Sequence, residues 1–183
     1  MKLLRTIALD PSDTFVFDVA AEPGEWAVSG AFRFWDHDAA RLDGKARAAF
    51  RGGFLGVQSW GWSTLAQIVP ASEDDYRNLV DLLARQLVDR FGAPDMTAAK
   101  TAAEEEVAFA QSLCSHPISS LIAVHRTSSD GEVRESFRRL QLRQGQGQGQ
   151  GHSKAFSFME IEDDVQPDGD LRLADLGREP TVR

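Results

Sequence analysis

The most reactive side chains of the sequence lie at Cys114-Ser115-His116, where a thiol stands two positions from an imidazole. A cysteine nucleophile reacts as a thiolate, which a helix N-terminus stabilises and a helix C-terminus disfavours. Cys114 falls at the C-terminal end of a helix predicted for about residues 95–114, and its spacing from His116 does not by itself align sulfur with a ring nitrogen. We therefore expect Cys114 to be a buried small apolar residue and predict no catalytic residue here.

Asp36, His37 and Asp38 are potential metal ligands that follow Trp35. In an extended segment the two aspartates share one face and His37 points away, so the three side chains do not readily bind one ion. Their spacing also matches no known ligand pattern. We expect a solvated strand end here, and the sequence indicates no metal site and no cofactor.

A glycine-rich run at residues 51–56, Arg-Gly-Gly-Phe-Leu-Gly, precedes a segment with strand character. A phosphate-binding loop needs a helix directly after it, whose free backbone amides bind the anion. The run is therefore predicted to be a turn rather than a nucleotide site.

Five arginines gather on a predicted hairpin: Arg126, Arg134, Arg138, Arg139 and Arg143. They alternate between the two faces of the hairpin, so an anion site is one interpretation. The other is that their long apolar stems cover the sheet while the charges pair in part with Glu132 and Glu135.

Four tryptophans lie in the first 62 residues, and two of them share the segment 56–69 with several small residues. If this segment is one strand, Trp60 and Trp62 lie on one face, while Ser59, Gly61 and Ser63 leave the other face nearly bare. A helix packed on the bare face is one interpretation, and a groove for a ligand or partner is the other. The candidate groove residues are Trp26, Trp35, Ser59, Trp60, Gly61, Trp62 and Ser63.

The elements that position these residues follow from hydrophobic periodicity and turn signals. Strands are expected at 3–9, 14–19, 26–35 and 57–69, with a short helix at 39–50; helices at 73–91 and about 95–114 follow, then a hairpin of 118–127 and 132–142 around Asp130-Gly131, and a last strand at 154–161. In the hairpin, Ser129 is expected opposite Glu132, Val124 opposite Phe137 and Arg126 opposite Glu135. The predicted fold is α+β: a mainly antiparallel sheet of about six or seven strands, with the helix pair 73–114 inserted midway and packed on one face.

Length and charge limit the domain organisation and the partners. The 183 residues suffice for one domain, predicted at 1–161 with a flexible Gly-Gln loop at 144–151. Residues 162–183 are predicted to be an acidic mobile tail, with seven acids and three arginines supplying −4 of the net charge of −8. So acidic a chain repels nucleic acid and anionic lipid. A single cysteine, no convincing signal peptide and no long apolar run favour the cytoplasm.

Several short segments are similar to a small family of uncharacterised bacterial proteins, a domain of unknown function. They are residues 1–7 (MKLLRTI), 14–17 (TFVF), 23–28 (PGEWAV), 54–56 (FLG) and 61–65 (GWSTL). The resemblance covers residues 1 to about 161 and implies no catalytic residues.

The leading hypothesis for function is a non-enzymatic cytoplasmic accessory protein that binds a protein partner. No nucleophile–base pair or ligand set supports a reaction, whereas the aromatic sheet and the acidic tail with Leu171, Leu173 and Leu176 suit protein contacts. Homo-oligomers are compatible with this hypothesis. The alternative is a small-molecule-binding enzyme or carrier that uses the tryptophan-lined groove near Ser59, Gly61 and Ser63.

Overall fold

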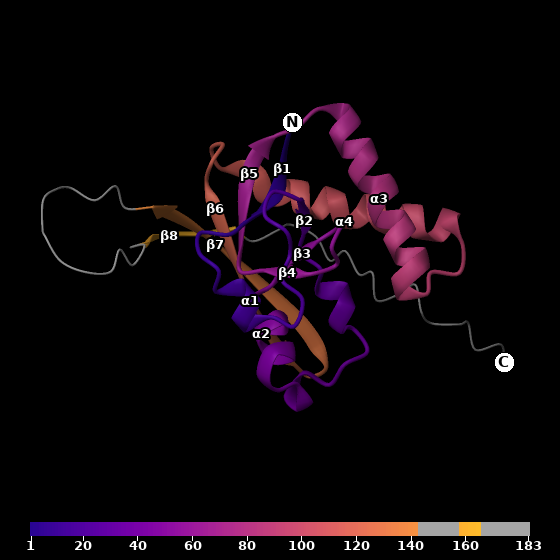
Figure 1. Cartoon of the computed structure of the whole chain (residues 1–183), viewed down its shortest axis with the longest axis horizontal. Coiled ribbons are helices and arrows are strands. Elements are labelled where there is room, and N and C mark those ends of the chain that lie inside the picture. The colour runs from indigo at the N-terminus through magenta and orange to yellow at the C-terminus, as the bar shows by residue number, and fades with distance from the viewer. Residues whose placement is uncertain (143–157, 166–183) are drawn as a thin grey trace, which may run out of the picture.

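The computed structural model describes residues 1–142 and 158–165 and has one antiparallel sheet (Figure 1). In these residues eight strands occur in the order β4-β3-β2-β1-β5-β6-β7-β8. Their bounds are Lys2–Ile7 (β1), Trp26–Val28 (β2), Phe54–Gly56 (β3), Trp62–Ser63 (β4), Leu65–Pro70 (β5), Leu121–Ser129 (β6), Glu132–Leu142 (β7) and Phe158–Val165 (β8). The predicted α+β fold with a mainly antiparallel sheet is confirmed.

Strand β1 lies in the middle of the sheet, between β2 and β5. Successive side chains of a strand point to opposite faces, and the neighbours Leu3 and Leu4 are both fully buried. Both faces of the sheet are therefore covered at its centre. Phe54 of β3 and Phe137 of β7 lie far apart in the strand order, yet their ring centroids are 6.2 Å apart, so the sheet curls.

The helix pair forms as the sequence predicts. Helix α3 spans Glu73–Phe91, begins with a capping box between Ser72 and Asp75, and ends at Gly92 with φ of 77°. Helix α4 spans Met96–Ser112 and continues into the 3-10 turn η3, Leu113–Ser115. α4 packs along β1 and β2 and against α3, so the pair supplies one wall of the core.

The β6–β7 hairpin also has the predicted register. Asp130 and Gly131 both have positive φ, 55° and 80°, as a type I′ turn requires. Opposite one another stand Ser129 and Glu132, Arg126 and Glu135, and Val124 and Phe137. This register sets the neighbours of Arg126 described below.

Of the strands predicted in the first half of the chain, one is wrong and two are only partly correct. Residues 14–19 are not a strand: α1, Asp13–Val16, forms one helical turn there. The strand predicted for 26–35 is only β2, because Gly30 turns to φ of 76° and starts the 3-10 helix η1, Ala31–Phe34. The strand predicted for 57–69 is broken, because Trp60 has φ of 62° in the turn before β4.

A helix predicted for 39–50 appears as the 3-10 turn η2, Ala39–Arg41, followed by α2, Gly44–Gly52. The last strand, predicted at 154–161, is β8, which extends to Val165 and pairs with β7. The Gly-Gln loop at 144–151 and the tail beyond residue 165 lie outside the described residues. No helix among the described residues is long and apolar enough to cross a membrane.

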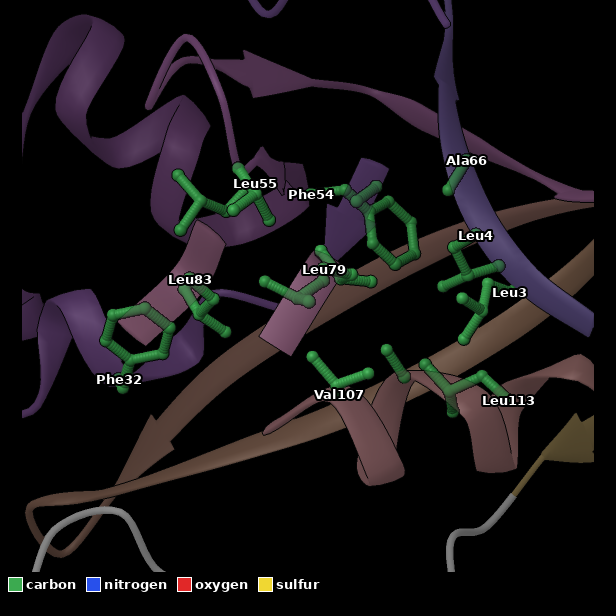
Figure 2. Packing of buried hydrophobic residues seen from close by; sticks show 14 of the residues in the cluster. Leu3, Leu4, Phe32, Phe54, Leu55, Ala66, Leu79, Leu83, Val107 and Leu113 are labelled. Atoms are coloured by element: carbon green, nitrogen blue, oxygen red, sulfur yellow. The ribbon is translucent and has the colours of Figure 1, made fainter. Parts of the chain in front are cut away.

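The core lies where the two helices meet the strands (Figure 2). Phe32 and Leu83 lie near Leu55, while Val107 and Leu113 approach the central strands from the side of α4. All five side chains are buried, so the core extends from β3 to the end of α4.

Candidate functional site

Trp60 and Trp62 are core residues, with 8% and 6% of their surface exposed. Both pack against η1: Phe32 lies 6.0 Å from Trp60 and Phe34 stacks on Trp62 at 5.2 Å, measured between ring centroids. The guanidinium of Arg33 lies 5.3 Å and 5.0 Å from the centroids of the two tryptophan rings, and its Nη1 donates to the carbonyl of Trp60 at 3.0 Å. These contacts form an aromatic cluster around one cation.

The other two tryptophans do not join this cluster. Trp26 is half-buried beneath Arg5, whose guanidinium lies 3.6 Å from the ring centroid. Trp35 is 42% exposed and contacts Phe91 at a centroid distance of 6.3 Å. Because β2 ends at Val28, Trp26 and Trp35 do not lie on one strand.

The bare face at Gly61 is occupied by the chain itself. A Cβ atom on Gly61 would lie 2.6 Å from the backbone carbon and oxygen of Ala20. Residues 19–21 run alongside, since Trp62 donates its N–H to Val19 O at 2.8 Å and Trp62 O accepts from Ala21 N–H at 2.8 Å. Gly61 therefore permits close backbone packing and does not line an open groove in this structure.

Ser59 and Ser63 have structural partners. The buried Glu25 carboxylate accepts the Ser59 hydroxyl and the backbone N–H groups of Ser59 and Gln58, at 2.8 Å and 2.9 Å for the two N–H groups. Ser63 Oγ donates to Leu65 O at 2.8 Å. Binding of a ligand or partner at these residues stays a prediction.

Arg126 is the largest fully buried side chain in the described part of the chain, although it is charged. Its Nε donates to Glu135 Oε1 at 2.7 Å, and Nη1 donates to the carbonyl of Gly53 at 2.7 Å and to that of Phe50 at 3.2 Å. Nη2 donates to the backbone and side-chain oxygens of Ser29. One guanidinium thus joins the ends of α2 and β2 to the β6–β7 hairpin and compensates the burial of its own charge.

A second carboxyl group lies next to this pair. Glu106 of α4 is 6% exposed, and its Oε1 accepts the N–H of Gly30 at 2.9 Å. Burial raises the pKa of Glu106 to about 7; the charge of Glu135 acts in the same direction, while the Gly30 N–H and Arg126 act against it. We call Ser29, Gly30, Glu106, Arg126 and Glu135 the buried polar cluster.

The remaining hairpin arginines differ from Arg126. Arg134 and Arg138 are exposed, Arg139 is half-buried, and Arg143 lies outside the described residues. The N–H groups of Arg126 all donate to protein acceptors, so this residue is structural rather than part of an anion site.

The thiol of Cys114 is buried, and burial raises its pKa to about 12, which disfavours the thiolate at neutral pH. Its Sγ donates to Ala110 O at 3.5 Å. His37 pairs through Nδ1 with Asp36 at 2.7 Å, whereas Asp38 caps η2 by accepting from Ala40 N–H at 3.0 Å. Within the described ranges, no three His, Cys, Asp or Glu residues are arranged to hold a metal ion.

Large apolar side chains are exposed on α1 and just after it. Phe15 is 75% exposed, Val16 38% and Val19 54%. We call these three residues the α1 apolar surface. The β-branched and aromatic residues of this stretch are typical of a strand, so sequence analysis missed that these side chains point outward. It also missed Glu106, which lies within an alanine-rich helical face.

Comparison with known proteins gives a family without a known activity. A model for a family of unknown function, DUF6505, matches residues 1–155. No curated protein and no solved structure matches the chain.

Proposed function

The chain belongs to this family of unknown function, DUF6505, and we propose that it is a non-enzymatic binding protein that docks on a protein partner through the α1 apolar surface. The exposure of Phe15, Val16 and Val19 on one short segment carries the proposal. Grouped large apolar side chains at a protein surface are typical of contact sites.

The α1 apolar surface is held in place by the fold. Phe17, between the exposed residues, is 1% exposed and anchors the segment in the core. The Asp13 carboxylate accepts the N–H of Thr64 at 3.2 Å and its hydroxyl at 2.5 Å. A contact site fixed in this way loses little conformational entropy when it binds, which favours affinity.

The charges of this segment indicate the chemistry of the partner. Asp10, Asp18 and Glu22 are exposed acids on residues 10–22, and Lys45, whose Nζ lies 3.5 Å from Phe17 O, is the nearby base. Exposed acidic residues thus flank the α1 apolar surface along the chain. It fits a protein with an apolar pocket and basic side chains at its rim, and it repels an anionic membrane or nucleic acid.

The alternative, a small molecule bound beside Trp60 and Trp62, requires residues 19–21 to leave Gly61. The absence of free space on that side makes it the weaker candidate. A cytoplasmic location belongs to the proposal, because the lone Cys114 forms no internal disulfide.

Native mass spectrometry of the tagged full chain isolated from its own host tests the proposal. We expect a protein retained in fixed stoichiometry by the wild type, lost from Phe15→Ser/Val19→Ser and weakened by Asp18→Asn. The matched control is Ile118→Ser, because Ile118 is 53% exposed on another part of the surface. Each substitution of such exposed residues changes stability by only about 0.5 kcal/mol, so the folded state is kept.

Three outcomes contradict the proposal: a chain that carries no other protein, a partner retained equally by the double variant, or a partner lost equally from Ile118→Ser. A retained second copy of the chain would make the surface a homo-oligomer contact and would refute a basic-rimmed partner. A small-molecule mass on an otherwise bare chain would support the alternative instead.

A further inference from the structure

Trp35 is an exposed tryptophan that the α1 apolar surface does not include. It follows η1 directly, and 42% of its surface is exposed. Its ring centroid lies 6.3 Å from that of Phe91, the last residue of α3, and Phe91 meets Phe32 edge to face at 5.1 Å. The backbone N–H of Trp35 donates to Phe32 O at 3.3 Å. Trp35 is thus fixed where η1 meets the end of α3 and is still open to solvent.

Two guanidinium groups lie at the same junction. Arg33 of η1 is half-buried against the rings of Trp60 and Trp62, whereas Arg90 of α3 is exposed and precedes Phe91. Burial lowers the pKa of Arg33, and the charge of Arg90 lowers it further, so the two cations lie close enough to repel each other. A carboxylate bound between them would relieve this repulsion.

Neither guanidinium has an acidic partner in the part of the chain that the structure describes. Arg33 donates to the carbonyl of Trp60, and Nε of Arg90 donates to Gln86 Oε1 at 2.7 Å. Gln86 is held in turn, because its Nε2 donates to Val57 O at 3.0 Å. The direction of the Arg90 side chain is therefore fixed, while its terminal nitrogens donate to no acceptor in the described residues.

The acidic residues nearest in the chain do not neutralise the junction. Asp36, which follows Trp35, pairs with Nδ1 of His37 at 2.7 Å. Asp89 precedes Arg90 on α3, and consecutive residues of a helix do not face each other. The junction therefore presents two cations whose charges its neighbours leave unpaired.

We propose that Arg33, Trp35 and Arg90 form a second docking surface, which binds an acidic peptide segment of a partner protein with an aromatic side chain next to its carboxylates. We call these three residues the η1–α3 surface. The guanidinium groups supply charge-assisted hydrogen bonds to carboxylates, and Trp35 supplies an apolar contact.

The residue types of the η1–α3 surface favour a peptide over a small anion. Tryptophan and arginine are the residues that most often dominate the binding energy of protein interfaces. A small anion would leave the exposed ring of Trp35 without a contact. The η1–α3 surface shares no residue with the α1 apolar surface, so this inference does not depend on the proposed function.

Titration of the full chain with synthetic peptides, followed by NMR of the Trp35 indole, tests the proposal. The probe is acetyl-Glu-Glu-Phe-Glu-Glu-amide, and the matched control is acetyl-Gln-Gln-Phe-Gln-Gln-amide, which has a similar shape and no charge. We expect the acidic peptide to shift the Trp35 indole resonance saturably and the neutral peptide to leave it in place. Added salt should weaken the binding, because the charges lie at the surface.

Two exposed arginines of α3 separate this surface from general charge attraction. Arg90→Gln is expected to weaken binding of the acidic peptide by about 2- to 5-fold, the usual size for an exposed ion pair. Arg85→Gln removes a charge elsewhere on the same helix and is expected to leave the affinity unchanged.

Four results would overturn the proposal. They are the absence of a saturable shift with the acidic peptide, an equal shift with the neutral peptide, equal weakening in Arg85→Gln and Arg90→Gln, and an equal shift of the Trp35 indole with inorganic phosphate. The last result would make the surface a site for small anions.

Discussion

Replacing Arg126 with Met removes the cation of the buried polar cluster while keeping an unbranched apolar chain of similar length. The guanidinium is fully buried and is the ion-pair partner of Glu135, whose side chain is 14% exposed. The substitution leaves the Glu135 carboxylate without its cation. It also leaves the carbonyl of Gly53 without the donor that lies 2.7 Å away.

The size of the effect follows from these two losses. Breaking a buried ion pair by removing one partner costs about 3–5 kcal/mol. Each buried carbonyl that loses its donor adds about 1–3 kcal/mol. We expect Arg126→Met to lower the free energy of unfolding by at least about 4 kcal/mol, a large part of the roughly 5–15 kcal/mol typical of a domain.

Urea unfolding followed by tryptophan fluorescence and circular dichroism measures this loss. Arg126→Met/Glu135→Gln is expected to recover about 1–3 kcal/mol, because the second substitution removes the uncompensated charge. Arg134→Met, at an exposed arginine of the same hairpin, is the control and should lie within about 0.5 kcal/mol of the wild type. A loss below about 1 kcal/mol for Arg126→Met, or a double variant no more stable than the single one, would refute the reasoning.

Three further predictions concern stability. Gly61→Ala should destabilise the folded state or prevent folding, because the added Cβ atom would lie 2.6 Å from the Ala20 backbone. The control Gly52→Ala should be tolerated, because the nearest atom to its added Cβ lies 3.8 Å away. Equal melting temperatures of the two variants would contradict this prediction. Glu106 binds its proton more tightly in the folded state, so its contribution to stability is complete below pH 4.5 and is lost as pH rises to about 7, by about 3 kcal/mol. The free energy of unfolding of Glu106→Gln, minus that of the wild type, should therefore rise by about 3 kcal/mol between pH 4.5 and pH 7. A difference that stays constant with pH would count against this prediction. Glu25→Gln replaces one of the two oxygens that accept the N–H groups of Glu22, Gln58 and Ser59 by an NH2 donor, so it should lower the free energy of unfolding by about 2 kcal/mol, measured in urea. An unchanged free energy would show that these N–H groups do not need the carboxylate.

The second half of the chain could be predicted because its signals are local. The capping box at Ser72, the helical spacing of apolar residues and Gly92 define α3 within the sequence itself. Asp130-Gly131 fixes both the turn and the register of β6 and β7. That register already placed Arg126 opposite Glu135, although it did not show that the pair is buried.

The first half could not be predicted, because contacts distant in sequence decide its backbone. Gly30 leaves the strand where its N–H meets Glu106, 76 residues further on. The turn of α1 is stabilised by hydrogen bonds that Thr64, 51 residues away, donates to the Asp13 carboxylate. The β-branched and aromatic content of residues 14–19 was therefore a poor guide to Phe15, which points into solvent.

Photocrosslinking at position 15 tests the central proposal most directly. The full chain, with benzoylphenylalanine in place of Phe15, is irradiated in its own host, and a second version with the same group at Ile118 is the matched control. Docking through the α1 apolar surface predicts one discrete crosslinked protein from position 15 that is absent from position 118. No crosslinked protein from position 15, or the same products from both positions, would contradict it.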